Sequence, residues 1–172
     1  MLNSIEDKKD ILKEDIKKIL TFSDSDNILL LGMGNDFRSD DGIGIYIVEH
    51  LNPLNLNVGI LNLRNTPEMF LDDIVQSKPN KTILFDAANF EGVPGEIKYI
   101  PQKYINNYTL STHTFPPGVI AELIKEDTDS DVYFIGIQAE NFDLGEEISP
   151  SVQKSGDTLI KFINKEIKKC MN

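Results

Sequence analysis

The sequence predicts an α/β protein built as a three-layer sandwich, in which helices cover both faces of a mostly parallel sheet. Three observations predict this class. Short apolar runs of strand length alternate along the chain with segments of helical periodicity. The first of these runs ends at a glycine turn that leads directly into a helix. The 172 residues fit one domain, and a hydrophobic content of 40% is sufficient for a core.

The first half of the chain is expected to form three helices and two strands. The expected elements are an amphipathic helix over Ile5–Phe22, a buried strand over residues 28–31, a helix from Gly42, a strand over Val58–Leu63 and a helix from Thr66-Pro67-Glu68. The apolar residues that share one face of the first helix are Ile11, Leu12, Ile16, Ile19 and Leu20.

The second half continues the alternation and adds an edge strand. The expected elements are a buried strand over Lys81–Asp86 that ends at Asp86, an antiparallel edge strand over Glu96–Ile100, a helix over Pro117–Ile124, a strand over Val132–Ile137 and a long helix from Ser149-Pro150 to about Lys169. The sequence contains no internal repeat, low-complexity segment or domain linker, so one domain over residues 1–172 is expected.

The overall charge excludes several classes of partner. A net charge of -11 and a pI near 4.6 argue against nucleic acid and anionic membranes. The lysines near the C-terminus are expected to form the solvated face and dipole-matched end of the last helix: Lys161, Lys165, Lys168 and Lys169. Neither a signal peptide nor an apolar run of membrane-spanning length is present, so a soluble, cytoplasmic protein is expected. Cys170 is the single cysteine, which excludes an internal disulfide or a thiolate cluster.

Two aspartates are expected at the carboxyl ends of strands. Asp41 follows the first strand, in a helical first turn capped by Ser39 or Asp40, where the helix dipole would keep its carboxylate ionised. Asp86 ends a later strand, and the carboxyl ends of parallel neighbours meet at one edge of the sheet. His113, in a loop before two prolines, is a third candidate. Such a mixed nitrogen and oxygen set binds borderline divalent metals and leaves positions for substrate or water.

Simpler interpretations of the same residues remain open. Asp86 is also typical of a cap or turn residue, and His113 could be a loop residue bonded to a neighbouring hydroxyl. His50 is expected at the surface, and Cys170 is expected to take no part in function. The glycine turn does not favour nucleotide binding, because Phe37 occupies the position of the third glycine of a dinucleotide fingerprint and no Gly-Lys-Ser/Thr follows.

Several short motifs appear in the order typical of one family. They run from about residue 27 to residue 162 and are Gly32-Met33-Gly34-Asn35, Ser39-Asp40-Asp41-Gly42-Ile43-Gly44, Thr66-Pro67-Glu68, Asp86-Ala87, Pro94-Gly95-Glu96-Ile97, Ser111-Thr112-His113, Gly136-Ile137-Gln138 and Leu144-Gly145-Glu146-Glu147-Ile148-Ser149-Pro150. On these motifs the chain resembles the hydrogenase maturation endopeptidases, which trim the C-terminal extension from the precursor large subunit of nickel-iron hydrogenases. It looks most like the branch serving membrane-bound or formate-linked hydrogenases. The departures are an N-terminal extension over residues 1–26, expected to be helical, and Ala139 in place of the commoner proline.

The resemblance implies a twisted five-stranded sheet between helices, and a metal site formed by Asp41, Asp86 and His113, which would also be the catalytic residues. It implies that the metal is nickel already inserted in the precursor, so that the enzyme needs no permanent cofactor, although another divalent ion could occupy the site. The implied partner is the large-subunit precursor, and we expect a monomeric enzyme.

The residues leave the mechanism open. A metal could polarise the carbonyl or activate water, or one carboxylate could act as the general base, as in an aspartic-type endopeptidase. No serine, cysteine or threonine lies in a nucleophile elbow, which argues against an acyl-enzyme. Two alternative functions are a nickel-checking chaperone that binds without cutting and a nucleotide-binding or small-molecule enzyme.

Overall fold

A computed structural model describes residues 12–52, 57–109, 115–145 and 147–170. Its centre is a five-stranded sheet with the strand order β2-β1-β3-β5-β4. The strands are β1 (Ile28–Met33), β2 (Val58–Arg64), β3 (Lys81–Ala88), β4 (Ile97–Ile100) and β5 (Asp131–Gln138). Neighbouring strands are parallel except β4, which pairs antiparallel with β5 at one edge. Both the predicted class and the predicted antiparallel edge strand are confirmed.

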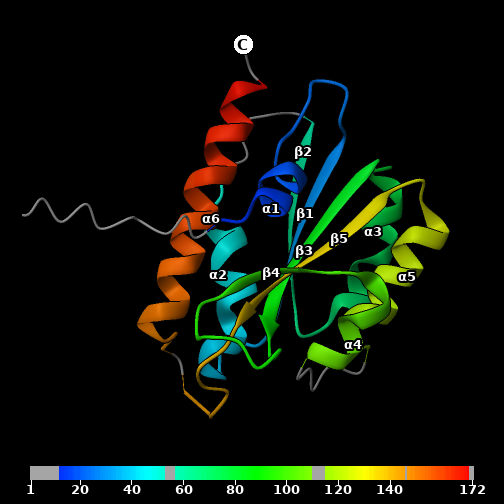
Figure 1. Cartoon of the computed structure of the whole chain (residues 1–172). Coiled ribbons are helices and arrows are strands. Elements are labelled where there is room, and N and C mark those ends of the chain that lie inside the picture. The colour runs from blue at the N-terminus through cyan, green and yellow to red at the C-terminus, as the bar shows by residue number, and fades with distance from the viewer. Residues whose placement is uncertain (1–11, 53–56, 110–114, 146, 171–172) are drawn as a thin grey trace, which may run out of the picture.

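Helices cover both faces of the sheet. They are α1 (Glu14–Ile19), α2 (Ile43–Glu49), α3 (Leu71–Gln76), α4 (Ile105–Tyr108), α5 (Pro117–Asp127) and α6 (Pro150–Lys169). Short 3-10 turns lead into three of them: η1 (Ser39–Gly42), η2 (Pro67–Phe70) and η3 (Gln102–Tyr104). Figure 1 shows α1, α2 and α6 on one side of the sheet and α3, α4 and α5 on the other. The predicted three-layer sandwich is therefore present.

Each face of the sheet has its own apolar core, because successive strand residues point to opposite sides. Along β3, Ile83 and Phe85 join the core beneath α1, α2 and α6, whereas Leu84 joins the core beneath α3, α4 and α5. Residues Ile28 to Met33 of β1 are all buried. This two-sided burial explains why the central strands read as continuous apolar runs rather than alternating ones.

Three elements differ from the sequence-based expectation. The first helix begins only at Glu14, because Lys13 has an extended backbone with ψ 155°, and it ends before Phe22; residues 5–11 lie outside the described part. The strand containing Asp86 continues to Ala88, so Asp86 lies within it and does not end it. The helical segment over residues 102–108 was not predicted, since its sequence carries no periodic apolar pattern long enough to indicate a helix.

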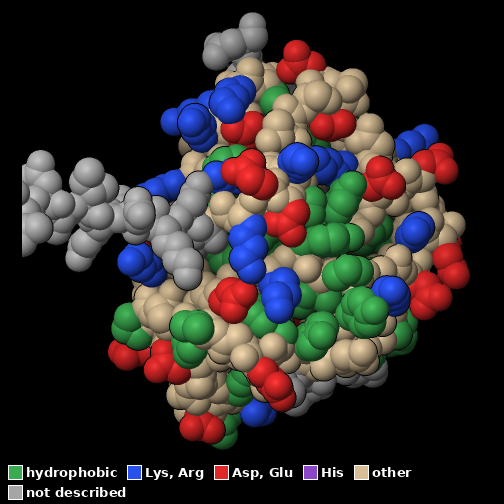
Figure 2. All heavy atoms as spheres, in the orientation of Figure 1, with side chains coloured by type: hydrophobic (Ala, Val, Ile, Leu, Met, Phe, Trp, Pro, Cys, Tyr) green, Lys and Arg blue, Asp and Glu red, His purple; other side chains and the backbone are tan. Residues whose placement is uncertain are grey.

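The other expectations agree with the structure within a few residues. The apolar face of the first helix is buried at Leu12, Ile16, Ile19 and Leu20, while Ile11 lies outside the described residues. Among the described helices, none is long and apolar enough to cross a membrane. Figure 2 shows charged side chains of both signs across one face of the molecule, with apolar side chains gathered around β5, α4 and α5.

Candidate active site

The two candidate aspartates lie near the same end of the parallel strands, and both lie close to Gly34. β1 and β3 are adjacent and parallel, with Gly32 opposite Phe85, so the loop after β1 passes beside Asp86. Gly34 has a φ of 136°, which L side chains rarely adopt. A Cβ atom there would lie 1.8 Å from the carbonyl oxygen of Asp41 and 3.5 Å from Oδ1 of Asp86. Only glycine therefore fits at this position against both residues.

Helix α2 also approaches the strand ends very closely at Gly44. A Cβ atom at Gly44 would lie 2.2 Å from the carbonyl oxygens of both Met33 and Phe85. The helix backbone therefore packs directly on β1 and β3. This contact places the η1 turn, and with it Asp41, over the carboxyl ends of these strands.

The neighbouring aspartates Asp40 and Asp41 have different surroundings. The carboxylate of Asp40 accepts hydrogen bonds from the backbone N–H groups of Glu140 (2.8 Å), Asn141 (2.9 Å) and Ser149 (2.6 Å), and from the Ser149 hydroxyl (3.0 Å). It thereby holds the loop between β5 and α6 against the loop after β1. The expectation that Ser39 or Asp40 caps the helix was wrong, because neither side chain makes a cap hydrogen bond.

Ser39 completes this connection through its backbone and hydroxyl. It has a left-handed backbone with φ 49°, its N–H donates to the Gly145 carbonyl at 2.7 Å, and its hydroxyl donates to the Asp143 carbonyl at 3.1 Å. Strained backbone of this kind persists only when surrounding contacts enforce it. The four bonds to Asp40 and the two from Ser39 supply that enforcement.

Asp41 is 5% exposed, and burial is the main cause that raises its pKa, from 3.8 to about 6. The positive charge of Arg38 and the backbone N–H of Asn35 lower the pKa but do not balance the loss of water. The sequence-based expectation named the helix dipole as the main influence on this carboxylate, whereas burial dominates and raises the pKa; a pKa of about 6 still leaves the group mostly ionised at neutral pH. The turn before α2 is short and the carboxyl is buried, so desolvation exceeds the dipole interaction.

Asp86 is 2% exposed, and burial raises its pKa well above 3.8. The charge of Asp41 raises the pKa further, while the N–H of Ala87, 2.8 Å from Oδ1, lowers it. The two acids therefore titrate as a pair, and both are disfavoured in the ionised form. Among the described residues, no lysine or arginine forms an ion pair with either acid. Buried carboxylates in this state can share a proton or bind a cation.

The third predicted ligand, His113, lies outside the described residues, as do Ser111 and Thr112. Within the described part of the chain, no group of three or more His, Cys, Asp or Glu side chains could hold a metal ion. The structure thus brings together the two carboxylates of the predicted set, and the contribution of the imidazole stays a prediction.

Gln138, the last residue of β5, has a structural role that sequence reasoning did not assign. Its buried side chain accepts hydrogen bonds from the N–H groups of Phe90 (2.9 Å) and Gly92 (3.1 Å) and donates to Asn89 Oδ1 (3.2 Å) and the Ala139 carbonyl (3.0 Å). It fixes the loop that follows β3 beside Asp86. The sequence does contain a signal for this role, because Gln138 is a polar residue at the end of a buried apolar strand and must find hydrogen-bond partners.

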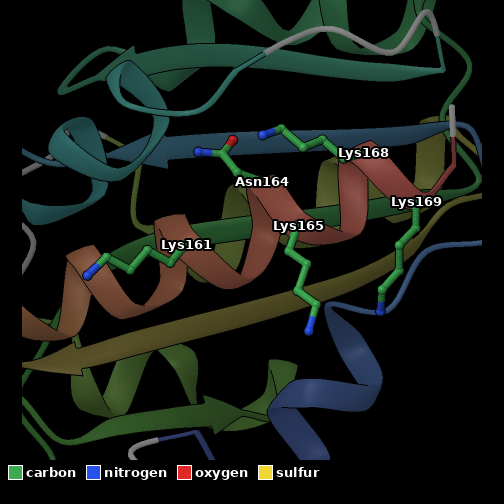
Figure 3. A pocket seen from close by; sticks show the side chains of 5 residues that line it. All are labelled: Lys161, Asn164, Lys165, Lys168 and Lys169. Carbon is green, nitrogen blue, oxygen red and sulfur yellow. The ribbon is translucent and has the colours of Figure 1, made fainter.

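The residues expected to be unrelated to the site lie elsewhere. His50 is exposed at the end of α2, with Nδ1 2.8 Å from the Tyr46 carbonyl oxygen. Cys170 is half-buried, with Sγ 3.5 Å from the Phe22 carbonyl oxygen, near the start of β1. The lysines of the last helix line an open surface hollow of about 520 Å³ together with Asn164, as Figure 3 shows. This hollow lies on α6, toward the C-terminus, whereas the aspartates lie at the carboxyl edge of the sheet.

The arrangement defines a class of protein: an α/β fold with two neighbouring buried carboxylates near the carboxyl ends of parallel strands. A sequence model of the hydrogenase maturation protease family matches residues 45–166, a range that contains Asp86 and begins just after Asp41. The chain belongs to the hydrogenase maturation protease family, and it is a peptidase.

Relatives of the chain agree with this assignment. The crystal structure of a NiFe hydrogenase maturation protease, HycI from Thermococcus kodakarensis KOD1, is 32% identical and superposes with a TM-score of 0.77, covering 90% of this chain and 99% of that one. A protein of Methanocaldococcus jannaschii that carries the provisional name hydrogenase maturation protease is 31% identical over 148 residues, 79% of this chain and 88% of its own length. The hydrogenase 3 maturation protease of Escherichia coli K12 is 29% identical over 114 residues, 65% of this chain and 72% of its own.

Proposed function

We propose that the protein is an endopeptidase that removes the C-terminal extension of a nickel-iron hydrogenase large-subunit precursor after nickel insertion. The observation that carries the proposal is the pair of buried carboxylates at the carboxyl ends of the parallel strands, which form no ion pair with a described lysine or arginine. The names of the relatives support the substrate class, since one is a NiFe hydrogenase maturation protease and another acts in the maturation of hydrogenase 3.

Nickel carried by the precursor would be the recognition element. Asp41 and Asp86 would supply oxygen ligands and His113 a nitrogen ligand, a combination that suits a borderline divalent cation. Metal ligands must be deprotonated, so a cation would displace the proton that burial favours on the two acids. In this proposal the enzyme binds a precursor that contains nickel and rejects one that does not, because Arg38 and the backbone N–H groups do not balance the cost of burying two negative charges and the metal does.

The chemistry would be the addition of water to the scissile carbonyl. The bound precursor would hold its peptide bond at the acid pair, so that proximity contributes much of the rate. A carboxylate accepts a proton from the attacking water, and that proton then passes to the leaving amine as the C–N bond breaks.

The test uses purified protein and the precursor in nickel-loaded and nickel-free forms, with cleavage followed by a gel mobility shift. We expect only the loaded precursor to be cut. Efficient cleavage of precursor kept free of nickel by chelator would show that the peptide sequence alone is sufficient. Metal-dependent binding without a mobility shift would favour a chaperone that checks for nickel and does not cut.

A further inference from the structure

Two large apolar side chains stand exposed beside the acid site. Phe37 is 64% exposed and Leu144 is 84% exposed. They belong to segments far apart in the sequence, the loop after β1 and the loop between β5 and α6. Figure 1 shows the second loop, in orange, at the end of the molecule where β3 and β5 finish.

A short parallel bridge joins the two segments next to these side chains. It pairs Arg38 with Gly145, and its hydrogen bonds run from Gly145 N–H to the Phe37 carbonyl (2.9 Å) and from Ser39 N–H to the Gly145 carbonyl (2.7 Å). Phe37 and Leu144 each precede a bridged residue. The bridge therefore places the backbones of Phe37 and Leu144 next to each other, and both side chains are exposed there.

This pair of side chains lies close to the reacting groups and on a rigid support. Arg38, between Phe37 and Ser39, is near enough to Asp41 to lower its pKa. The hydrogen bonds of Asp40 and Ser39 described above hold the two loops together. The loops could cover the apolar side chains only if these hydrogen bonds broke. Apolar side chains kept in water by a rigid scaffold mark a binding surface, and such a surface loses little conformational entropy on binding.

The charge around this surface is net negative, because three acidic side chains on one loop outnumber Arg38 on the other segment. Glu140, Asp143 and Glu147 are exposed on the same loop, and residues 140–147 contain no lysine or arginine. Asp36, on the other segment, is already paired with Arg64 at 2.8 Å. A complementary ligand would combine apolar side chains with positive charge.

We propose that Phe37 and Leu144 form a docking surface for an apolar and basic segment of the polypeptide substrate, next to the bond that is cut. The proposal rests on the proposed function and extends it. Binding of the precursor's nickel would restrict cleavage to precursors whose metal centre is complete. The Phe37–Leu144 surface would select and orient the polypeptide segment that carries the scissile bond. Phe37 and Leu144 determine specificity and take no part in bond breaking.

The experiment measures steady-state cleavage of the nickel-loaded precursor by the double variant Phe37→Ser/Leu144→Ser. We expect KM to rise about tenfold with kcat within about twofold of wild type, because truncated contact residues at an interface centre lose binding energy of this order. The conservative variant Phe37→Leu/Leu144→Met should keep the wild-type KM. Val75→Ala is the matched control and should keep the wild-type KM. Val75 is a partly exposed apolar residue beside Lys78, near the amino ends of the parallel strands and away from the acid site.

A charge variant tests the second half of the proposal. Asp143→Asn should raise KM severalfold at low ionic strength and have little effect at high salt, because the attraction is screened. Asp129→Asn, which removes an exposed aspartate near the amino ends of the parallel strands, should leave KM unchanged at both ionic strengths.

Failure of the two proposals can be told apart. If wild-type protein does not cut loaded precursor, the proposed function is wrong, and the docking surface falls with it. If wild type cuts but the double serine variant keeps the wild-type KM, or loses kcat alone, only the docking surface is overturned. Because both side chains are exposed, the melting temperature of the double variant should match wild type, which excludes unfolding as the cause of a raised KM.

Discussion

Replacing Asp41 by asparagine should stabilise the protein above pH 6 while it abolishes processing. Burial raises the pKa of Asp41 from 3.8 to about 6, so the folded state favours its protonated form. In the unfolded chain the group ionises near its ordinary value. Between these two pKa values the folded state binds more protons than the unfolded state, and stability therefore falls as pH rises.

The magnitude follows from the two pKa values. The stabilising effect of protonation is fully present below pH 3.8 and is lost as pH rises through about 6. A difference of about two pKa units corresponds to about 3 kcal/mol, at 1.36 kcal/mol per unit. Asparagine has nearly the same shape and carries no charge. The stability difference between variant and wild type should thus change by up to about 3 kcal/mol in favour of the variant between pH 4 and pH 8.

This outcome is opposite to the one expected from sequence, by which loss of the dipole interaction would cost the variant a few tenths to about 1 kcal/mol. The assay is urea unfolding of wild type and Asp41→Asn at pH 4, 6 and 8, followed by circular dichroism. Processing of loaded precursor is measured on the same samples. A variant that is less stable than wild type by the same amount at every pH would refute the reasoning, because burial would then not be the dominant influence on this carboxyl.

Four further predictions concern single residues. Asp86→Asn should abolish processing with an unchanged circular dichroism spectrum, because a neutral amide is a poor metal ligand; activity near wild type would remove Asp86 from the site. His113→Ala should abolish processing of loaded precursor, with the exposed His50→Ala as its silent control; near-normal cleavage would favour a site of two carboxylates alone. Gly34→Ala should destabilise the protein by about 3 kcal/mol or more in denaturant unfolding, given a Cβ 1.8 Å from a carbonyl oxygen; a loss below about 1 kcal/mol would mean that the loop moves easily. Asp40→Ala should cost about 3 kcal/mol or more in the same assay, because three backbone N–H groups lose their acceptor; a cost near zero would mean that water replaces it.

The order of strands and helices could be predicted from the sequence because their signals are local. A strand buried on both faces, such as β1, reads as an uninterrupted apolar run. Proline at the first helical position marks the starts of α5 and α6. The short segment over residues 102–108 escaped prediction for the same reason, since it is helical without a sustained pattern.

The approach of Asp41 to Asp86 could also be anticipated, because parallel strands deliver their carboxyl ends to one edge of the sheet. The sequence placed Asp41 in the site and gave Asp40 as a possible helix cap, but it could not predict which groups Asp40 binds. The two are adjacent and chemically identical, and Asp40 became structural only by bonding Glu140, Asn141 and Ser149, about 100 positions further along the chain.

Tertiary structure alone decided the protonation of the acid pair. The position of Asp41 at the start of a helix predicts an ionised carboxylate, and that prediction uses only neighbours in sequence. The pKa of each acid depends on how much water the packed loops remove and on the charge of the neighbouring acid, contacts that exist only in the folded chain. Residue type and topology thus placed two carboxylates at one end of the sheet, whereas desolvation, which depends on every surrounding segment at once, raised their pKa values.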